Sequence, residues 1–273
     1  NPLRGLSQKI HDIQTNKMDV RLDENKVPIE LVNMVQSFNA MLDRLQGEFI
    51  RLSNFSSDIA HELRTPLTNI ITQTQVGLSK KRQSEEYQEL LFSNLEELER
   101  LTKMVNDMLW LAKSQNGLIK PAQDILSSHE EIEVLFEYFD ALAEESSLIL
   151  HKAGENISFY CDKLHFRQLL SNLLSNAIRY APKGSSITVC SEITSAEKVC
   201  ICVSNTGEKI PSAHLPYLFD RFYRSDKSRQ RHSDGAGLGL AIVKALAEAN
   251  GGNVKVCSND QNTCFNVYLN LFK

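Results

Sequence analysis

The feature that most constrains the fold is a stretch in which apolar side chains recur at the three- and four-residue steps of a helix. Its positions are Leu45, Phe49, Leu52, Ile59, Leu63, Ile70 and Thr74. This spacing is typical of one face of a long helix that packs in a bundle or a coiled coil. His61 lies off this face, so we expect its imidazole on the solvent-facing side, where another domain can reach it.

His61 has the neighbours that a reactive histidine needs. A neutral imidazole is nucleophilic near pH 7, and Glu62 can orient the ring and take its proton. Pro66 lacks an amide hydrogen and clashes with the preceding turn, so we expect it to kink or loosen the helix just after the histidine. The competing interpretation is that His61 is one exposed histidine among the seven in the chain.

The run His-Glu-Leu-Arg-Thr-Pro at residues 61–66 resembles the H-box of sensor histidine kinases. Agreement in type and order across consecutive positions favours the reactive interpretation. The resemblance implies that His61 is the phosphoacceptor and Glu62 its base. It also implies that Thr65 positions a water molecule for dephosphorylation of a partner protein.

Length and composition limit the class of protein. With 273 residues and 42% hydrophobic content, the chain can form one large or two to three small packed domains. A net charge of -4 and a pI near 6.0 give no electrostatic basis for nucleic-acid binding. The sequence does not start with a signal peptide, and no apolar run approaches the length that spans a bilayer, so we expect this chain to be soluble.

The cysteines gather in the C-terminal half, mostly in segments with strand-like patterns. They are Cys161, Cys190, Cys200, Cys202, Cys257 and Cys264. We interpret them as small hydrophobic residues of a protein from a reducing compartment. Cys200 and Cys202 alternate along a predicted strand, which places two thiols on one face, and a soft-metal site there is the alternative interpretation.

Residues 1 to about 53 contain two helix-like patterns. The first has its apolar stripe at Leu3, Leu6, Ile10 and Ile13. An extended connector over residues 18–28 follows, and a second helix begins at Pro28 and continues without a break toward His61. This order resembles a HAMP signal-relay module, with an ordinary helical hairpin as the alternative.

A second long helix follows the polar turn at residues 79–84. Its apolar positions are Leu91, Leu95, Leu98, Leu101, Val105, Met108 and Ala112. Two long helices joined by a short turn form an antiparallel hairpin. One hairpin cannot bury both apolar faces well, so we expect a homodimer in which two hairpins form a four-helix bundle.

The pattern changes after Pro121, because residues 122–273 mix strands and helices. We predict helices over residues 132–142, 163–180 and 239–250, and strands over residues 157–161, 186–193, 198–204, 253–257 and 264–271. These elements form an α/β sandwich, a mixed sheet covered on one face by helices. The predicted class is therefore an α+β multidomain protein, with domains at residues 1–50, 51–116 and 122–273 and a linker at 117–121.

The helix predicted over residues 163–180 carries the first group of candidate binding residues. Asn172 and Asn176 lie four residues apart on one face, and an amide oxygen suits Mg²⁺, a hard cation. Arg179 can contact phosphate and Tyr180 can pack along a nucleotide. Surface asparagines without a ligand are the alternative. The run from Asn172 to Tyr180 resembles the N-box of the same kinases and of the gyrase and Hsp90 ATPases, which implies Asn176 as the Mg²⁺ ligand and Asn172 as a phosphate or water contact.

A glycine-rich run, residues 235–240, precedes the last predicted helix. Gly235, Gly237 and Gly239 allow the backbone to approach phosphates, and a helix N-terminus offers unpaired amide hydrogens. A Rossmann dinucleotide site is the competitor, but it requires a preceding parallel strand, whereas a polar and basic segment precedes here. The run, with Leu238, resembles the G2 box of the kinases, which holds the β- and γ-phosphates of ATP.

Residues 204–234 form a long polar segment with little periodicity, which is typical of a functional loop. It resembles the ATP lid of the kinases, and Phe219 and Phe222 match the aromatics of the F-box that anchor this lid. A short amphipathic turn tucked into the core is the alternative for these two aromatics.

One run departs from the family pattern. The G1 box usually opens with an aspartate that accepts a hydrogen bond from adenine, with glycines two and four places on. Here Asn205 replaces the aspartate, Gly207 keeps the first glycine and Lys209 replaces the second. Asn205 keeps an acceptor oxygen without the charge, so we expect adenine recognition that is retained but weaker or differently tuned.

Together these motifs resemble a sensor histidine kinase of a two-component system over nearly the whole chain, most like the copper- or silver-responsive subfamily. The resemblance implies ATP and Mg²⁺ as cofactors, autophosphorylation on His61, and transfer to the receiver domain of a response regulator. It also implies the cytoplasmic portion of a bacterial inner-membrane protein that is anchored through a preceding transmembrane region.

Two other classes of function stay open. The chain could be a gyrase- or Hsp90-type ATPase that hydrolyses ATP without transferring phosphate, or a catalytically silent dimeric scaffold, which the altered run at Asn205 favours. For the kinase function, the catalytic domain must move on the linker at residues 116–121 to reach His61.

Overall fold

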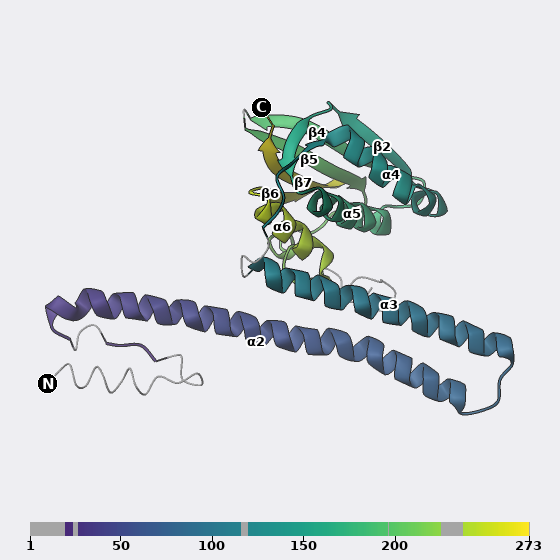
Figure 1. The fold of residues 1–273 in the computed structure, drawn as a ribbon, viewed down its shortest axis with the longest axis horizontal. Helices are drawn as coiled ribbons and strands as arrows, with labels where there is room; N and C mark the ends of the chain where they lie inside the picture. Colours follow the sequence, from purple (N-terminus) through teal and green to yellow (C-terminus); the bar gives the residue numbers. More distant parts are fainter. Residues whose placement is uncertain (1–19, 24–26, 116–119, 196, 225–236, 273) are drawn as a thin grey trace. The chain divides into compact units, whose positions relative to one another are not determined.

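The computed structural model describes residues 20–23, 27–115, 120–195, 197–224 and 237–272. The chain divides into two compact units, Asn1–Asn94 and Leu95–Lys273. Figure 1 shows the long helices of the N-terminal half and the sheet that follows in the sequence. No helix among the described residues combines the length and hydropathy needed to cross a bilayer.

The first unit is dominated by helix α2, Ile29–Leu78, a continuous helix of 50 residues. Pro28 precedes it, where a missing amide hydrogen costs nothing, and Glu30 in its first turn complements the helix dipole. The helix continues through Pro66, which cannot donate to the carbonyl of Glu62 one turn earlier. The long helix expected from the apolar spacing is therefore confirmed, and the proline does not end it.

The connector before α2 is held by a small apolar cluster and by one amide. Leu22 and Val35 are buried together, with Val27 and Phe38 against them. Asn39 Oδ1 accepts from the Leu22 N–H at 3.0 Å, and Asn39 Nδ2 donates to the Leu22 carbonyl at 2.9 Å. The first predicted helix, with its stripe at residues 3–13, lies outside the described residues.

Helix α3, Ser84–Gln115, follows a short turn. Its start is capped by Glu86, whose carboxylate accepts from the Gln83 N–H at 3.1 Å. Near the turn the two helices touch, because Asn94 Nδ2 donates to Thr74 Oγ1 at 3.1 Å. Gly77 permits this approach, since a Cβ there would lie 2.6 Å from Leu90 Cδ1. The predicted antiparallel hairpin is confirmed at this end.

Residues 120–272 are here called the sheet domain, and their described part forms a seven-stranded sheet with three helices. The strands are β1 Asp124–Ser127, β2 Ile149–Gly154, β3 Ser158–Cys161, β4 Ser186–Ser195, β5 Lys198–Thr206, β6 Asn253–Ser258 and β7 Asn262–Leu271. The helices are α4 Ser128–Glu145, α5 Lys163–Tyr180 and α6 Gly239–Ala249, with a short 3-10 turn at Leu215–Tyr217. The strand order is β1-β3-β7-β5-β4-β2, with β6 also on β7. Strand β2 pairs with β4 in parallel, and the other pairs are antiparallel.

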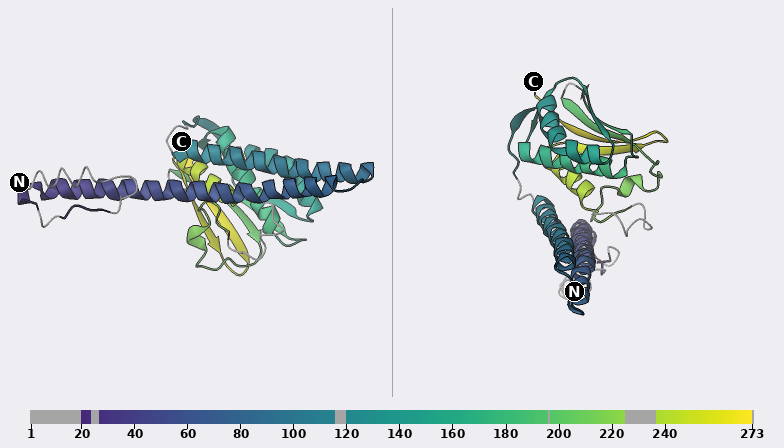
Figure 2. Two further views of the ribbon diagram at one scale, coloured as in Figure 1. Left: turned by 90° about the horizontal axis from the view of Figure 1, so that it is seen from below. Right: turned by 90° about the vertical axis from the view of Figure 1, so that its right-hand side faces the viewer.

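All three helices cover the same face of the sheet (Figures 1 and 2). Alternate residues of β5, Val199, Ile201 and Val203, are fully buried on this face. The leucines of α5 that close the core are Leu169, Leu170, Leu173 and Leu174. The predicted mixed sheet with helices on one face is confirmed.

Caps and pairing explain which elements the sequence predicted. Helix α5 has the predicted bounds because Asp162 caps its start, accepting from the His165 N–H at 3.0 Å, and because buried leucines follow at helical spacing. Strands β1 and β2 were not predicted. The first has four residues, and the second pairs in parallel with β4, a distant segment, and has no buried residue of its own.

Candidate functional site

The predicted phosphoacceptor region lies on α2. His61 is exposed on this helix, Thr65 is exposed one turn later, and Glu62 is half-buried. His61 and Thr65 share one face because they are four residues apart. The imidazole is thus open to a reagent from solvent, and a hydroxyl lies on the same side.

Helix α5 presents the predicted amides. Asn172 and Asn176 are half-buried, whereas Arg179 and Tyr180 are exposed at the end of the helix. Asn172 Nδ2 donates to the Gln168 carbonyl at 2.9 Å, which fixes the orientation of its amide. Its oxygen is therefore the atom that remains to accept a bond from a ligand or water.

The start of α6 lies against this amide. A Cβ added at Gly239 would lie 3.3 Å from Asn172 Oδ1. Leu238, the residue before, is 2% exposed and belongs to the core. Gly235 lies outside the described residues. The free N–H groups of the first turn of α6 thus lie beside the Asn172 oxygen, an arrangement that suits an anion.

Two segments that are distant in sequence meet at Phe222 and Gly237. The Phe222 N–H donates to the Gly237 carbonyl at 2.9 Å, and Gly237 has a φ of 71°. A Cβ at Gly237 would lie 2.8 Å from Phe222 Cα, so only glycine fits. Phe222 itself has a φ of 59°, which is uncommon for an aromatic residue and indicates a conformation imposed by its surroundings.

Phe219 contacts the sheet. Its ring meets that of Phe265 edge to face, with 6.3 Å between centroids, and Leu218 beside it is buried. Next to it, His214 Nδ1 and the Tyr223 hydroxyl are 2.5 Å apart. Phe219 therefore attaches the described part of the predicted lid to β7, and this contact also fits the alternative of a turn tucked into the core.

The altered run begins at the end of β5. Asn205 is 5% exposed, and its Nδ2 donates to the Thr206 carbonyl at 2.8 Å. A Cβ at Gly207 would lie 3.3 Å from the Tyr180 carbonyl, which brings this run to the end of α5. Lys209, in place of the second glycine, pairs through its Nζ with Asp260 at 3.1 Å.

The structure thus connects the predicted residues pairwise: Asn172 with Gly239, Gly207 with Tyr180, and Phe222 with Gly237. Sequence reasoning missed Gln168, whose carbonyl orients Asn172. The four-residue separation of these two residues in a helix is the signal that could have identified it.

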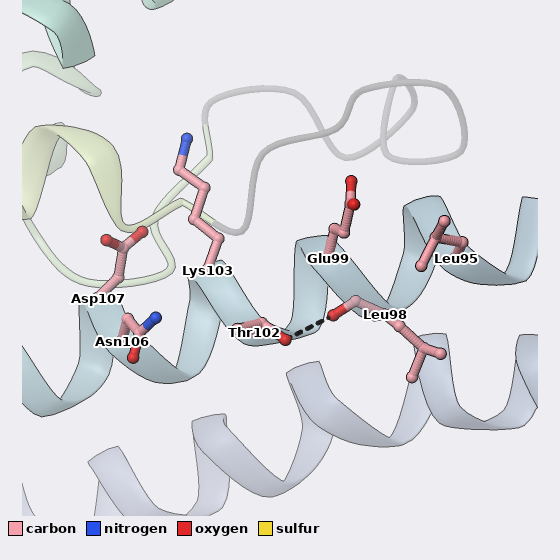
Figure 3. Close-up of a pocket in the computed structure, with 7 residues that line it drawn as sticks. All are labelled: Leu95, Leu98, Glu99, Thr102, Lys103, Asn106 and Asp107. Atoms are coloured by element: carbon pink, nitrogen blue, oxygen red, sulfur yellow. Dashed lines mark hydrogen bonds between the residues drawn. The ribbon is translucent and has the colours of Figure 1, made fainter. Parts of the chain in front are cut away.

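A hollow of about 470 Å³ lies elsewhere, against α3. Figure 3 shows the side chains that line it, all from one helix: Leu95, Leu98, Glu99, Thr102, Lys103, Asn106 and Asp107. Burial raises the pKa of Asp107, and Lys103 partly offsets this. None of the predicted nucleotide-binding residues belongs to this lining set, so we assign it no ligand.

Family models match three parts of the chain. Residues 161–273 match the histidine kinase-, DNA gyrase B- and HSP90-like ATPase, and residues 51–117 match the His Kinase A (phospho-acceptor) domain. Residues 1–47 match the HAMP domain of PhoQ-like sensor proteins. His61 falls within the second match, and all predicted nucleotide-binding residues fall within the first.

The chain is also similar to a curated protein, the sensor histidine kinase CusS of Escherichia coli O157:H7. The two are 48% identical over 268 residues, which are 98% of this chain and 55% of the relative. The chain spans about half the length of the curated relatives it matches.

Solved structures share the fold. The histidine kinase AdeS of Acinetobacter baumannii gives a TM-score of 0.65 at 23% identity, covering 78% of this chain and 98% of that chain. Histidine kinase ThkA, solved in complex with response regulator protein TrrA, gives 0.68 at 20% identity, covering 83% of this chain and 64% of that chain. At these identities the likeness shows the fold alone, and it agrees with the predicted class.

Proposed function

Because the chain belongs to the sensor histidine kinases, we propose that it transfers the γ-phosphoryl group of ATP to His61 and then to an aspartate of a response regulator. The observation that carries this proposal is the exposed His61 on α2, in a chain that also carries an ATPase-type domain. The domain bounds 1–50, 51–116 and 122–273, with the linker at 117–121, are part of the proposal.

The transfer to His61 is a substitution at phosphorus. A ring nitrogen of His61 forms the new bond to the γ-phosphorus, the bond from that phosphorus to the β,γ-bridging oxygen breaks, and ADP leaves with the electron pair. Glu62, the adjacent half-buried carboxylate, takes the imidazole proton. Exposure of His61 supports this role, because the ATP-binding domain must approach it.

The phosphate-binding residues follow from the contacts of α5 and α6. The fixed oxygen of Asn172 and the first-turn N–H groups after Gly237 and Gly239 form the anion side of the site. Asn176, one turn from Asn172, offers the amide oxygen that would hold Mg²⁺, and Arg179 would contact phosphate. When bound, Mg²⁺ supplies charge neutralisation at the transferred group.

Adenine recognition is proposed for Asn205 and Gly207, with Tyr180 packed along the nucleotide and Phe219 and Phe222 at the lid. Because Asn205 Nδ2 is committed to the Thr206 carbonyl, its oxygen is left to accept from the adenine amino group. Lys209, which replaces the second glycine, pairs with Asp260, and we assign it no contact with adenine. These contacts favour a working nucleotide site over a silent scaffold.

We propose a homodimer for the two helices. Leu52 is 61% exposed, and Leu91 and Phe92 are 65% and 67% exposed. Apolar stripes of this kind on a helical hairpin are buried when two hairpins form a four-helix bundle.

The remaining parts of the proposal concern partners and setting. ThkA was solved with a response regulator, and we propose a receiver domain as the partner of this chain, with Thr65 positioning the water that dephosphorylates it. The HAMP match supports a place in the cytoplasmic part of a bacterial inner-membrane receptor. The resemblance to copper- and silver-responsive kinases supports a metal-stress stimulus.

The test is incubation of the purified chain with γ-labelled ATP and Mg²⁺. We expect acid-labile, base-stable label on the protein, absent in His61→Gln and retained in His151→Gln, because His151 is an exposed histidine of β2. Label that persists in His61→Gln would contradict the assignment of the acceptor. Hydrolysis of ATP without label on the wild type would indicate a gyrase- or Hsp90-type ATPase, and absence of nucleotide binding would indicate the scaffold.

A further inference from the structure

The face of the sheet opposite the helices carries most of the cysteines. On β5, Cys200 and Cys202 alternate with the core residues that face the helices. Cys190, Cys257 and Cys264 lie on the same open face, because β4, β6 and β7 pair in register with it. Cys161 is different, since it is buried two residues after Phe159, whose ring packs on α5.

Cys264 is the centre of this thiol group. It is directly opposite Cys257 in the β6–β7 register, and the Cys257 thiol donates to the Cys264 carbonyl at 3.8 Å. On its other side, Cys264 is paired with Ser204 in the β5–β7 register. Its thiol donates to Ser204 Oγ at 3.3 Å. All these cysteines are free.

The surroundings favour one partner for Cys264. Cys202 is not directly opposite Cys264, because in the β5–β7 register it pairs with Asn266. Cys257 is exposed and receives a hydrogen bond from Asn266 Nδ2 at 3.7 Å. Cys257 is therefore the thiol that is both directly opposite Cys264 and exposed to solvent.

The number of ligands limits the metal. Within the described ranges, no group of three or more His, Cys, Asp or Glu side chains is placed to hold a metal ion. A closed tetrahedral Zn²⁺ site, which needs four ligands, is therefore not available there. Two opposed thiolates instead suit soft d¹⁰ monovalent ions, and directly opposite residues have Cβ atoms about 4.5–5.5 Å apart, close enough for a sulfur–metal–sulfur bridge.

We propose that Cys257 and Cys264 form a two-thiolate site for a soft monovalent metal ion, of the Ag(I) or Cu(I) class, on the open face of the sheet. The exposed Cys257 gives the ion access from solvent, and Asn266 orients its sulfur. Binding replaces the two thiol protons by one cation, with no change of oxidation state. The site is separate from the residues proposed to bind ATP, and the inference does not rest on the kinase function.

The test uses Ag(I), which does not cycle its oxidation state under these conditions. The full chain, with its thiols reduced and counted and air excluded, is titrated with Ag(I) against a competing chelator. We expect one tight equivalent. Cys257→Ser or Cys264→Ser should weaken it at least about a hundredfold, because loss of a direct ligand exceeds the 10- to 100-fold cost of losing an outer partner.

Matched controls separate this site from general thiol binding. Cys190→Ser, on the same open face, and Cys161→Ser, in the core, should keep the tight equivalent, and circular dichroism should show that each variant is folded. The proposal is overturned if Ag(I) affinity is unchanged in Cys257→Ser and Cys264→Ser. It is equally overturned if every cysteine variant loses the same amount. A repeat with Cu(I) under reducing conditions should reproduce the ranking of the variants if the site is general for this class, and a different ranking would contradict the assigned pair.

Discussion

In the sheet domain the core leucines of α5, Leu169, Leu170, Leu173 and Leu174, are almost fully buried, whereas many apolar side chains of α2 and α3 are exposed. Leu173 and Leu174 have no measurable exposure, while Leu52 and Leu91 are 61% and 65% exposed. The sheet domain closes its core within one chain, because a sheet face and three helices cover each other. A helical hairpin has too few neighbours for this, so its apolar faces require another surface. The two regions should therefore respond differently to substitution.

The largest expected effect is on the helices. Leu52→Asp places a carboxylate on the exposed stripe of α2, and the proposed dimer would carry it twice. We expect the dimer dissociation constant to rise roughly a thousandfold, about 4 kcal/mol, because each carboxylate would be buried without a partner. Analytical ultracentrifugation of the purified chain measures this change.

Leu164→Asp is the matched control, because Leu164 is 76% exposed but lies on α5, in the sheet domain. It should leave the dimer intact. If both variants dimerise as the wild type does, the exposed stripe of α2 is not the dimer surface. The proposal that the helices need a partner to bury their apolar residues would then be contradicted.

A smaller effect is expected in the core of the sheet domain. Leu173→Ala removes a fully buried side chain of α5 and should lower the free energy of unfolding of this domain by about 3 kcal/mol. Dimerisation through the helices should be unchanged. Denaturant unfolding, followed in parallel with sedimentation, measures both quantities, and Leu164→Ala is the exposed control. Loss of the dimer in Leu173→Ala would mean that the regions are not independent.

The same difference explains how far the sequence predicts the fold. Spacing of apolar residues is a local signal, so it identified α2, α3 and α5, whose faces repeat over many turns. Strand β2 was missed because its partner β4 is distant and parallel. In the candidate site, the residue types of Asn172 and Asn205 were readable, but the bonds that orient their amides were not. Those bonds depend on the folded backbone, as does the contact of Phe222 with Gly237.

The smallest expected effect concerns the contact of Phe222 with Gly237. A comparison of two glycines of the sheet domain tests it. Gly237 and Gly184 have similar φ values, 71° and 80°, but a Cβ at Gly184 would meet nothing within 4 Å, whereas at Gly237 it would overlap the Phe222 backbone. Gly184→Ala should therefore lower the free energy of unfolding by about 1 kcal/mol, because a residue with a Cβ disfavours the left-handed conformation. Gly237→Ala should lower the free energy of unfolding by about 2 kcal/mol and shift the segment beside α6.

The two alanine variants separate the effect on stability from the effect on nucleotide binding, because only Gly237 lies against the Phe222 backbone. Thermal unfolding gives the first quantity, and titration with a fluorescent ATP analogue gives the second. Because the start of α6 is proposed to hold the phosphates, analogue affinity should fall in Gly237→Ala and stay at the wild-type value in Gly184→Ala. Equal affinities in both variants would show that the Phe222–Gly237 contact supports the fold of this region without shaping the phosphate site.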